Sequence, residues 1–169
     1  MARDEMVAVV DAENRVVGAV PRHEMRAKNL LHRATYVFVF DSAGELYVQH
    51  RTMTKDVYPG YWDLAAGGVV LDGESYEESA VRELEEEMGI RGVELEPWFD
   101  FYFEDAGKVW GRAFSCVWDG EIVPQAEEVQ SVTQVAVETV LDGWDGRPMT
   151  PDSLLALRRR FREESLSQE

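Results

Sequence analysis

Short apolar segments separated by polar turns recur along the whole chain, and they predict a succession of strands interrupted by helices. Glycine, proline and acidic residues mark the turns between these segments. The predicted strands are Val7–Val10, Val16–Val20, Thr35–Asp41, Leu46–His50, Trp62–Ala66, Val93–Phe103, Val109–Trp118 and Val129–Val137. The first two strands flank a polar turn and form a hairpin at the N-terminus.

Three helices are predicted from their end signals. Ser75 followed by Glu78 is a capping box, and Gly89 stands where a left-handed C-terminal cap belongs, so the best-marked helix lies between them. A short helix begins with Pro21 at its first position and runs to about residue 28. A last helix follows Thr150, which is expected to cap it.

This order of strands and helices predicts an α/β fold in which a mixed β-sheet is sandwiched between helices, with the hairpin as an N-terminal extension. At 169 residues the chain is long enough to bury a sizeable core. Its content of 45% hydrophobic residues, with 11% aromatic residues, is typical of a folded globule. We therefore predict a single domain spanning residues 1–169.

The formal net charge of −16 limits the partners that this chain can have. No basic surface stands out that would neutralise a nucleic-acid backbone, so nucleic-acid binding is not expected. An anionic substrate that approaches such an acidic protein needs local cations, supplied by bound metal and a few placed Arg or Lys residues. The sequence gives no indication of the oligomeric state.

The single cysteine, Cys116, excludes an intramolecular disulfide and fits a reducing compartment. It lies in an alternating apolar segment, where a packed strand residue is expected. The N-terminus lacks the apolar core of a signal peptide, and no apolar run of membrane-spanning length occurs. We predict a cytoplasmic protein without a membrane partner.

The segment Gly68–Ile90 carries the candidate chemistry, because three of its glutamates are spaced i, i+3 and i+4 and so meet on one helix face: Glu83, Glu86 and Glu87. Val81, Leu84 and Met88 are expected on the other face, packed on a core. Three carboxylates so close resist ionisation unless a cation is present. Hard oxygen ligands at this density suit Mg²⁺ or Mn²⁺.

The same segment resembles the signature of the Nudix hydrolases. Gly68, Glu74 and the run from Arg82 to Ile90 match the Nudix box at every defined position. The resemblance implies that Glu83, Glu86 and Glu87 bind the divalent ion and that the carbonyl of Gly68 is a further ligand. It also implies that Glu74 and Arg82 pair to support the loop against the helix.

The stretch upstream of the box resembles the N-terminal half of type I isopentenyl diphosphate isomerase, which shares the Nudix fold. The similarity covers roughly residues 7 to 90. Arg51 and Lys55 match residues that contact the diphosphate in that enzyme, and cations on a loop beside the box suit phosphate oxygens. We therefore expect Arg51 and Lys55 to bind substrate.

Isomerase chemistry itself is disfavoured by several substitutions. The resemblance places Gly67 where the isomerase has its cysteine, and Val69 where it has a histidine. Its later pair of glutamates aligns best with Trp110 and Arg112. Only His32 remains among the expected metal ligands, and we predict that it is bonded within the fold. The histidines at positions 23 and 50 are expected at the surface.

The resemblance implies attack of a metal-activated water on a phosphorus atom of a diphosphate linkage. Glu86 or Glu87 would accept the proton, and Glu127-Glu128 on a later loop is the other candidate base. By elimination of more specialised markers, the expected substrate is a small nucleotide, a nucleoside di- or triphosphate that yields a nucleoside monophosphate. The alternative is a Nudix domain that binds a nucleotide without cleaving it.

Overall fold

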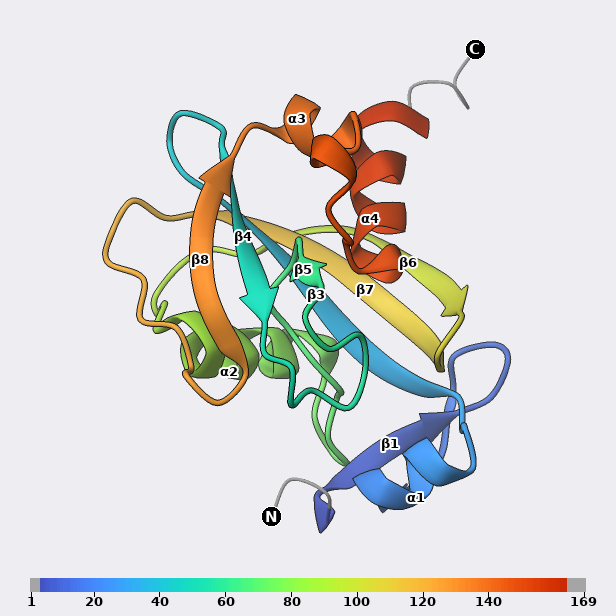
Figure 1. The fold of residues 1–169 in the computed structure, drawn as a ribbon. Helices are drawn as coiled ribbons and strands as arrows, with labels where there is room; N and C mark the ends of the chain where they lie inside the picture. Colours follow the sequence, from blue (N-terminus) through green and yellow to red (C-terminus); the bar gives the residue numbers. More distant parts are fainter. Residues whose placement is uncertain (1–3, 164–169) are drawn as a thin grey trace.

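The computed structural model describes residues 4–163, which form a mixed sheet with helices on both sides (Figure 1). The strands are β1 (Met6–Val10), β2 (Val16–Pro21), β3 (His32–Phe40), β4 (Leu46–Arg51), β5 (Trp62–Asp63), β6 (Glu96–Glu104), β7 (Lys108–Val117) and β8 (Val129–Val135). The helices are α1 (Arg22–Ala27), α2 (Tyr76–Met88), α3 (Val137–Leu141) and α4 (Pro151–Arg158). A 3-10 turn, η2 (Trp144–Gly146), precedes α4, and a π-helical turn, η3 (Arg159–Glu163), follows it.

Strand β3 is the centre of the sheet. It pairs with β7 in parallel along its whole length, and β7 continues into an antiparallel pair with β6. On its other side β3 meets β4 only at Phe40 and Leu46, so the two strands diverge from that point. Strand β4 then pairs with β8 and, briefly, with β5. The opening between β3 and β4 is where the box segment enters the fold.

Helices cover both faces of this sheet, which explains why β3 is continuously apolar. Val37 and Val39 of β3 pack in a core beneath α2. Tyr36 and Phe38 point the other way into a core closed by α3 and α4. Figure 1 shows α2 and α4 on opposite sides of β3 and β7. The predicted α/β arrangement of a mixed sheet between helices is confirmed.

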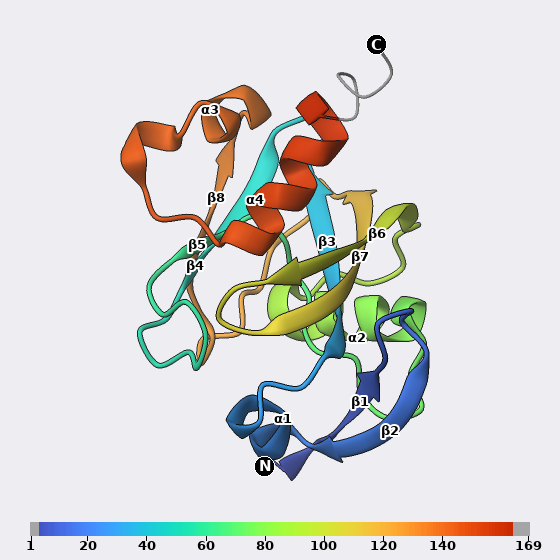
Figure 2. The ribbon, with the colours of Figure 1, turned by 90° about the vertical axis from the view of Figure 1, so that its right-hand side faces the viewer.

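The N-terminal hairpin and α1 pack together at one end of the molecule, at the bottom of Figure 2. A small core of Val7, Met25 and Val69 joins them to the box segment. Backbone contacts support this join, because the N–H of Ala8 donates to the carbonyl of Val70 at 3.2 Å. The extension is therefore attached directly to the loop that precedes α2.

The predicted strand Trp62–Ala66 is wrong in its length. Only Trp62 and Asp63 form β5, paired with β4. The chain then crosses the opening between the diverging strands, and Ala66 bridges to Val37 of β3. One segment thus changes its strand partner within a few residues, and period-two alternation gives no indication of such a change.

Two further boundaries differ from expectation. Strand β6 begins at Glu96 because Val93 and Leu95 pack beneath α2 before the strand starts. The strand predicted to reach Val137 ends two residues earlier, and the five-residue helix α3 was missed. Helix α3 has no side-chain cap, and its place is set by burial of residues 140 and 141 against α4.

Helix ends agree with the prediction most closely in α2. Ser75 and Glu78 form both hydrogen bonds of the capping box, and Gly89 closes the helix with a left-handed φ of 68°. Pro21 precedes α1 as its N-cap residue and does not occupy the first helical position. Thr150 holds the N-cap position of α4, but its hydroxyl bonds to the side chains of Asp63 and Ser153 in place of the helix backbone.

Candidate active site

Two of the three box glutamates occupy the packed side of α2. Glu83 and Glu87 are buried, at 8% and 7% exposure, whereas Glu86 is exposed. Val81 was expected on the packing face, opposite the carboxylates. This expectation is wrong, because Val81 is 56% exposed. The packed stripe runs from Leu84 and Met88 through Glu83 and Glu87, because the helix lies over the box segment and places these carboxylates against it.

Glu87 is anchored to the loop that it faces. Its Oε2 accepts a hydrogen bond of 2.7 Å from the backbone N–H of Gly67. Gly67 has a φ of +145°, and a Cβ there would lie 2.0 Å from the carbonyl oxygen of Thr35. The next residue is equally tight, since a Cβ on Gly68 would approach Oε1 of Glu83 to 2.8 Å. The two glycines therefore allow the loop to lie directly on both carboxylates.

Arg82 holds the box together from the side. Its Nε and Nη2 donate to the carboxylate of Glu74 at 2.6 and 3.0 Å, which is the pairing expected from the sequence. Its Nη1 donates to Glu83 at 3.0 Å and to Glu86 at 3.2 Å. One guanidinium thus serves three carboxylates, in the bidentate geometry for which arginine is suited.

Burial makes the charges of Glu83 and Glu87 costly. Desolvation raises the pKa of Glu87 well above its ordinary value, and the neighbouring charge of Glu83 raises it further. Desolvation also raises the pKa of Glu83, although Arg82 opposes this and Glu86 adds to it. A divalent cation would relieve both costs.

The donor chemistry of the box fits a hard divalent ion, since carboxylate and carbonyl oxygens are the ligands that Mg²⁺ and Mn²⁺ take. Within residues 4–163 no three His, Cys, Asp or Glu side chains are already grouped as a metal site. Arg82 draws Glu83 and Glu86 toward itself, while the loop holds Glu87. The carbonyl of Gly68 accepts a 2.9 Å bond from the N–H of Thr35 and a longer one, of 3.5 Å, from the hydroxyl of the same residue.

A cavity of about 140 Å³ lies beside the box loop. Its wall includes Gly67, Gly68 and Val69, and four cationic side chains from two elements: Arg22 and Arg26 of α1, and Arg51 and Lys55 at the end of β4. Tyr58 and Phe103 give it an aromatic part, and Asp63 and Asp152 give it an acidic part. In a protein with a net charge of −16, this gathering of cations marks the cavity as the place for an anionic group.

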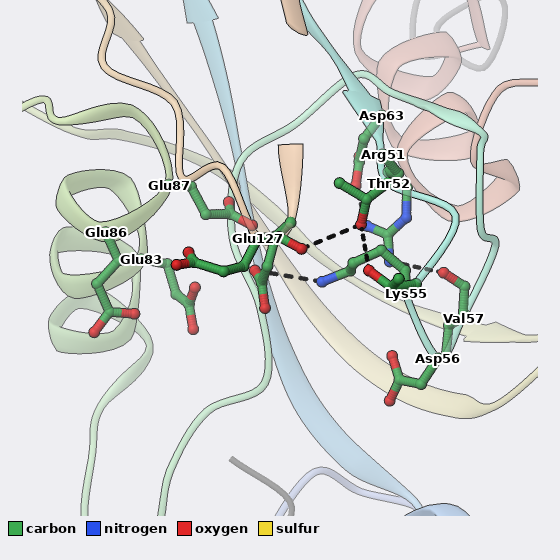
Figure 3. A network of polar contacts seen from close by, with 12 residues as sticks. Arg51, Thr52, Lys55, Asp56, Val57, Asp63, Glu83, Glu86, Glu87 and Glu127 are labelled. Atoms are coloured by element: carbon green, nitrogen blue, oxygen red, sulfur yellow. Dashed lines mark hydrogen bonds and ion pairs between the residues drawn. The ribbon is translucent and has the colours of Figure 1, made fainter. Parts of the chain in front are cut away.

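Arg51 and Lys55, which the sequence predicts to bind substrate, lie in this cavity wall, and both are already bonded to protein. Arg51 donates to Asp63 at 2.9 Å and to the carbonyls of Val57 and Tyr58. Lys55 pairs with Glu128 at 3.3 Å. Figure 3 shows this group facing the α2 glutamates, with Glu127 between them. Lys55 is close enough to lower the pKa of Glu87, which desolvation raises.

The loop that follows β7 brings the other candidate base to the site. Backbone bonds from Val123 to Met88 and from Gln125 to Glu87 hold this loop along the end of α2. Glu128 is half-buried beside Lys55, and its charge contributes to the raised pKa of Glu83, after the larger effects of desolvation, Arg82 and Glu86. Glu127 is exposed. Of the two residues, Glu128 is the one whose side chain joins the site.

Comparison with known proteins agrees with this geometry. The model of the NUDIX domain family matches residues 30–153. The chain belongs to the Nudix family. The Nudix hydrolase PA4841 of Pseudomonas aeruginosa, named uncharacterized, is 48% identical over 91% of this chain and 92% of its own length. YfcD of Escherichia coli K12, also named an uncharacterized Nudix hydrolase, is 44% identical over 100% of this chain and 96% of its own length.

Solved structures show the same Nudix fold. The crystal structure of DR0079 from Deinococcus radiodurans superposes with a TM-score of 0.83 at 23% identity, covering 94% of this chain and 100% of that one. The MutT protein from Methanosarcina mazei Go1 gives a TM-score of 0.67 at 25% identity, over 80% and 95% of the two chains. Membership makes this protein a Nudix pyrophosphohydrolase, a hydrolase of phosphoric anhydrides in nucleoside diphosphate derivatives. No helix within residues 4–163 is long and apolar enough to cross a membrane.

The Nudix loop also bears on the isomerase alternative. The position that would hold the isomerase cysteine is Gly67, and the contact with Thr35 leaves no space for a side chain there. Trp110 donates its indole N–H to the carbonyl of Ala12, and Arg112 pairs with Asp100 at 2.6 Å. Neither side chain supplies a carboxylate ligand. The arrangement therefore gives no support to isomerase chemistry.

The histidines of this Nudix protein have internal partners. His32 donates from Nδ1 to the carbonyl of Leu30 at 3.0 Å, as the prediction of a residue bonded within the fold required. The expectation that His50 is a surface residue without partners is wrong, because its ring stacks on Trp62 at 4.2 Å. The imidazole at position 23 pairs with Asp4 at 3.5 Å.

Three residues of the cavity wall were missed at the sequence level. Arg22 and Arg26 stand four residues apart in α1, and that spacing places both on one helix face. The spacing was available in the sequence, but nothing there placed α1 against the box. Asp152, at the start of α4, accepts a 2.8 Å hydrogen bond from the hydroxyl of Tyr36. This contact links residues far apart in the chain and has no local signature.

Proposed function

We propose that the protein is a Mg²⁺-dependent Nudix pyrophosphohydrolase that cleaves a nucleoside di- or triphosphate and releases the nucleoside monophosphate. The burial of Glu83 and Glu87 side by side on α2 carries this proposal. Desolvation raises the pKa of both groups, and the charge of Glu83 raises that of Glu87 further, while Arg82 pairs with Glu83. A protein that only bound nucleotides would have no need for this costly pair.

The ligands of the ion would be Glu83, Glu86, Glu87 and the carbonyl of Gly68. Mg²⁺ is the leading candidate and Mn²⁺ the alternative, because both prefer oxygen donors. When bound, the ion would lower the pKa of a water molecule and neutralise charge on phosphate oxygens. Arg82 would remain paired with Glu74, which keeps the loop and the helix in register.

Glu128 is the side chain that would take the proton from the attacking water. In the hydrolysis the water oxygen forms a bond to phosphorus, the bridging P–O bond breaks, and the displaced phosphate leaves with the electron pair. Lys55 lies 3.3 Å from Glu128 and holds that carboxylate beside the cavity. Lys55 and Arg51 line the cavity and would hold the phosphate oxygens of the substrate.

A free nucleotide is the proposed substrate. The cavity offers the rings of Tyr58 and Phe103 for stacking on a base. The net charge of −16 over the whole chain opposes binding along a nucleic-acid backbone. Local cations in one cavity instead suit a small anionic molecule.

The test is a panel of nucleoside di- and triphosphates and nucleoside diphosphate conjugates, incubated with Mg²⁺ and separated by chromatography. The wild-type protein and Glu85→Gln should release a nucleoside monophosphate from at least one compound, whereas Glu87→Gln should not. Glu85 is the matched control, because it lies on the same helix, is exposed and pairs with Arg91. Tight binding of a nucleotide without turnover by the wild type would support the binding-only alternative.

A further inference from the structure

The four cations of the cavity come from two different parts of the chain. Arg51 ends β4 and Lys55 lies on the loop after it, both within the matched Nudix region of residues 30–153. Arg22 and Arg26 belong to α1 of the N-terminal extension, outside that region. The extension therefore contributes half of the positive charge that lines the cavity.

The two pairs of cations differ in how many of their N–H donors bond to protein acceptors. All three nitrogens of Arg51 donate to protein oxygens. In α1, the Nε of Arg22 is buried without a hydrogen-bond partner among the described residues, while its Nη2 reaches Glu5 at 3.3 Å. A buried donor without an acceptor is costly unless a ligand satisfies it.

Arg26 extends along the same side of the cavity. Its Nε pairs with Asp56 at 3.1 Å, and its Nη1 points toward the β6–β7 turn, where a Cβ on Gly107 would lie 3.8 Å away. Desolvation and the nearby charge of Arg22 lower the pKa of Arg26, although Asp56 opposes them. An anion between the two guanidiniums would relieve this repulsion.

His32 completes this end of the cavity as a neutral group. Its Nδ1 donates to the carbonyl of Leu30, so Nε2 carries a lone pair. Burial, followed by the charges of Arg26 and Arg22, lowers the pKa of His32 to about 4. The positive charge at this end therefore comes from the two arginines, faced by Glu5 and Asp56.

This end of the cavity adjoins Lys55. Burial raises the pKa of Asp56, but the charges of Arg26, Lys55 and Arg22 lower it below its usual value, so these cations lie around one carboxylate. Lys55 also opposes the rise that burial causes in the pKa of Glu87. A chain of phosphates that passes Lys55 from the α2 carboxylates would therefore reach the α1 arginines.

We propose that Arg22 and Arg26 form a subsite for the terminal phosphate of the substrate, the part that leaves on hydrolysis. The inference rests on the proposed function and narrows it to substrates with a free terminal phosphate, nucleoside triphosphates above all. Nucleoside diphosphates whose far end is a neutral sugar leave this subsite unfilled. The N-terminal extension is then a specificity element of the enzyme.

Binding of inorganic pyrophosphate by calorimetry, in EDTA, tests the subsite without turnover. The wild type should bind pyrophosphate, and Arg22→Gln and Arg26→Gln should each weaken binding by about tenfold or more. Arg15→Gln is the matched control, because Arg15 lies in the hairpin turn of the same N-terminal extension, pairs with Asp11 and is 73% exposed. Arg22→Lys keeps the charge and checks that a loss does not come from misfolding, because it should bind better than Arg22→Gln.

Kinetics on two substrates of the same nucleoside provide the second readout. Arg26→Gln should raise KM about tenfold for the triphosphate and leave a neutral sugar conjugate unchanged. Unaltered pyrophosphate binding in both glutamine variants, absent binding by the wild type, or equal losses on both substrates would overturn the subsite. If the wild type hydrolyses no nucleotide yet its pyrophosphate binding depends on Arg22 and Arg26, the proposed function fails and the subsite stands.

Discussion

The carboxylate of Glu87 and the backbone N–H of Gly67 are joined by a hydrogen bond of 2.7 Å, so the helix that carries the acidic groups also fixes the loop in front of them. Gly67 has no side chain, so its backbone can lie against Thr35. A change that moves the loop at Gly67 will therefore also move the carboxylate of Glu87. Several measurable consequences depend on it.

Gly67→Ala should destabilise the protein by on the order of 3 kcal/mol or more, because the new Cβ would overlap the Thr35 carbonyl in a strained backbone region. The measurement is urea unfolding followed by circular dichroism. Gly73→Ala is the matched control, since Gly73 also has a positive φ, of +82°, but has nothing within 4 Å of a built Cβ. It should cost only about 1 to 2 kcal/mol, and equal losses in the two variants would contradict the steric account.

Arg82→Gln should destabilise the metal-free protein by about 2 kcal/mol, because it leaves three carboxylates without their shared cation. Saturating Mg²⁺ should reduce this loss, since the ion supplies positive charge to the same groups. Urea unfolding in EDTA and in Mg²⁺ measures both values. The exposed pair Arg91 and Glu85 provides the control, and Arg91→Gln should change stability by less than about 0.5 kcal/mol in either buffer. A loss that Mg²⁺ does not alter would argue against metal binding beside Arg82.

Asp152→Asn should remove a pH dependence of stability. Burial, followed by the charge of Asp63, raises the pKa of Asp152 from 3.8 to about 6. The folded protein then keeps this proton longer than the unfolded chain, so the wild type loses stability as the pH rises from about 4 through about 6, by on the order of 2 to 3 kcal/mol. Relative to wild type, the Asn variant should gain stability over that interval. If the difference in unfolding free energy between wild type and Asp152→Asn stays constant from pH 4 to pH 8, the prediction is contradicted.

Glu128→Gln should lower kcat by about 10² to 10⁴, the range for loss of a general base, while KM changes little. Glu127→Gln should have an effect of less than about twofold, because its side chain is exposed, whereas Glu128 pairs with Lys55 of the cavity wall. The two adjacent residues thus form a matched pair. Comparable losses in both variants would place the proton acceptor elsewhere, among the α2 glutamates.

The parts of this fold that follow local rules could be predicted from the sequence. Helix α2 begins at its capping box and ends at Gly89, because both ends depend on residues within a few positions of each other. The strand predicted at Thr35–Asp41 is present as β3, and its apolar residues pack in the cores on both faces of the sheet. The pairing of Glu74 with Arg82 followed from the Nudix resemblance, and the contact is present.

The remaining features depend on contacts between distant segments. Helix α3 has no cap, and only burial near α4 fixes it. The crossing of residues 62–66 from β4 to β3 exists because those strands diverge. The burial of Glu83 and Glu87 follows from where the box loop lies, which helical periodicity does not specify. The approach of α1 to the cavity likewise depends on the core that Met25 forms with Val69.

The central claim is that buried glutamates of α2 support Mg²⁺-dependent hydrolysis, and a Mg²⁺ titration of nucleoside monophosphate release tests it most directly. With the best substrate of the panel, wild type and Glu85→Gln should show no release in EDTA and a saturable rise with Mg²⁺. In Glu87→Gln the rate of release should be at least about a hundredfold lower than in wild type at every Mg²⁺ concentration. Release that persists in EDTA, or a Glu87→Gln titration that overlays the wild type, would contradict the account.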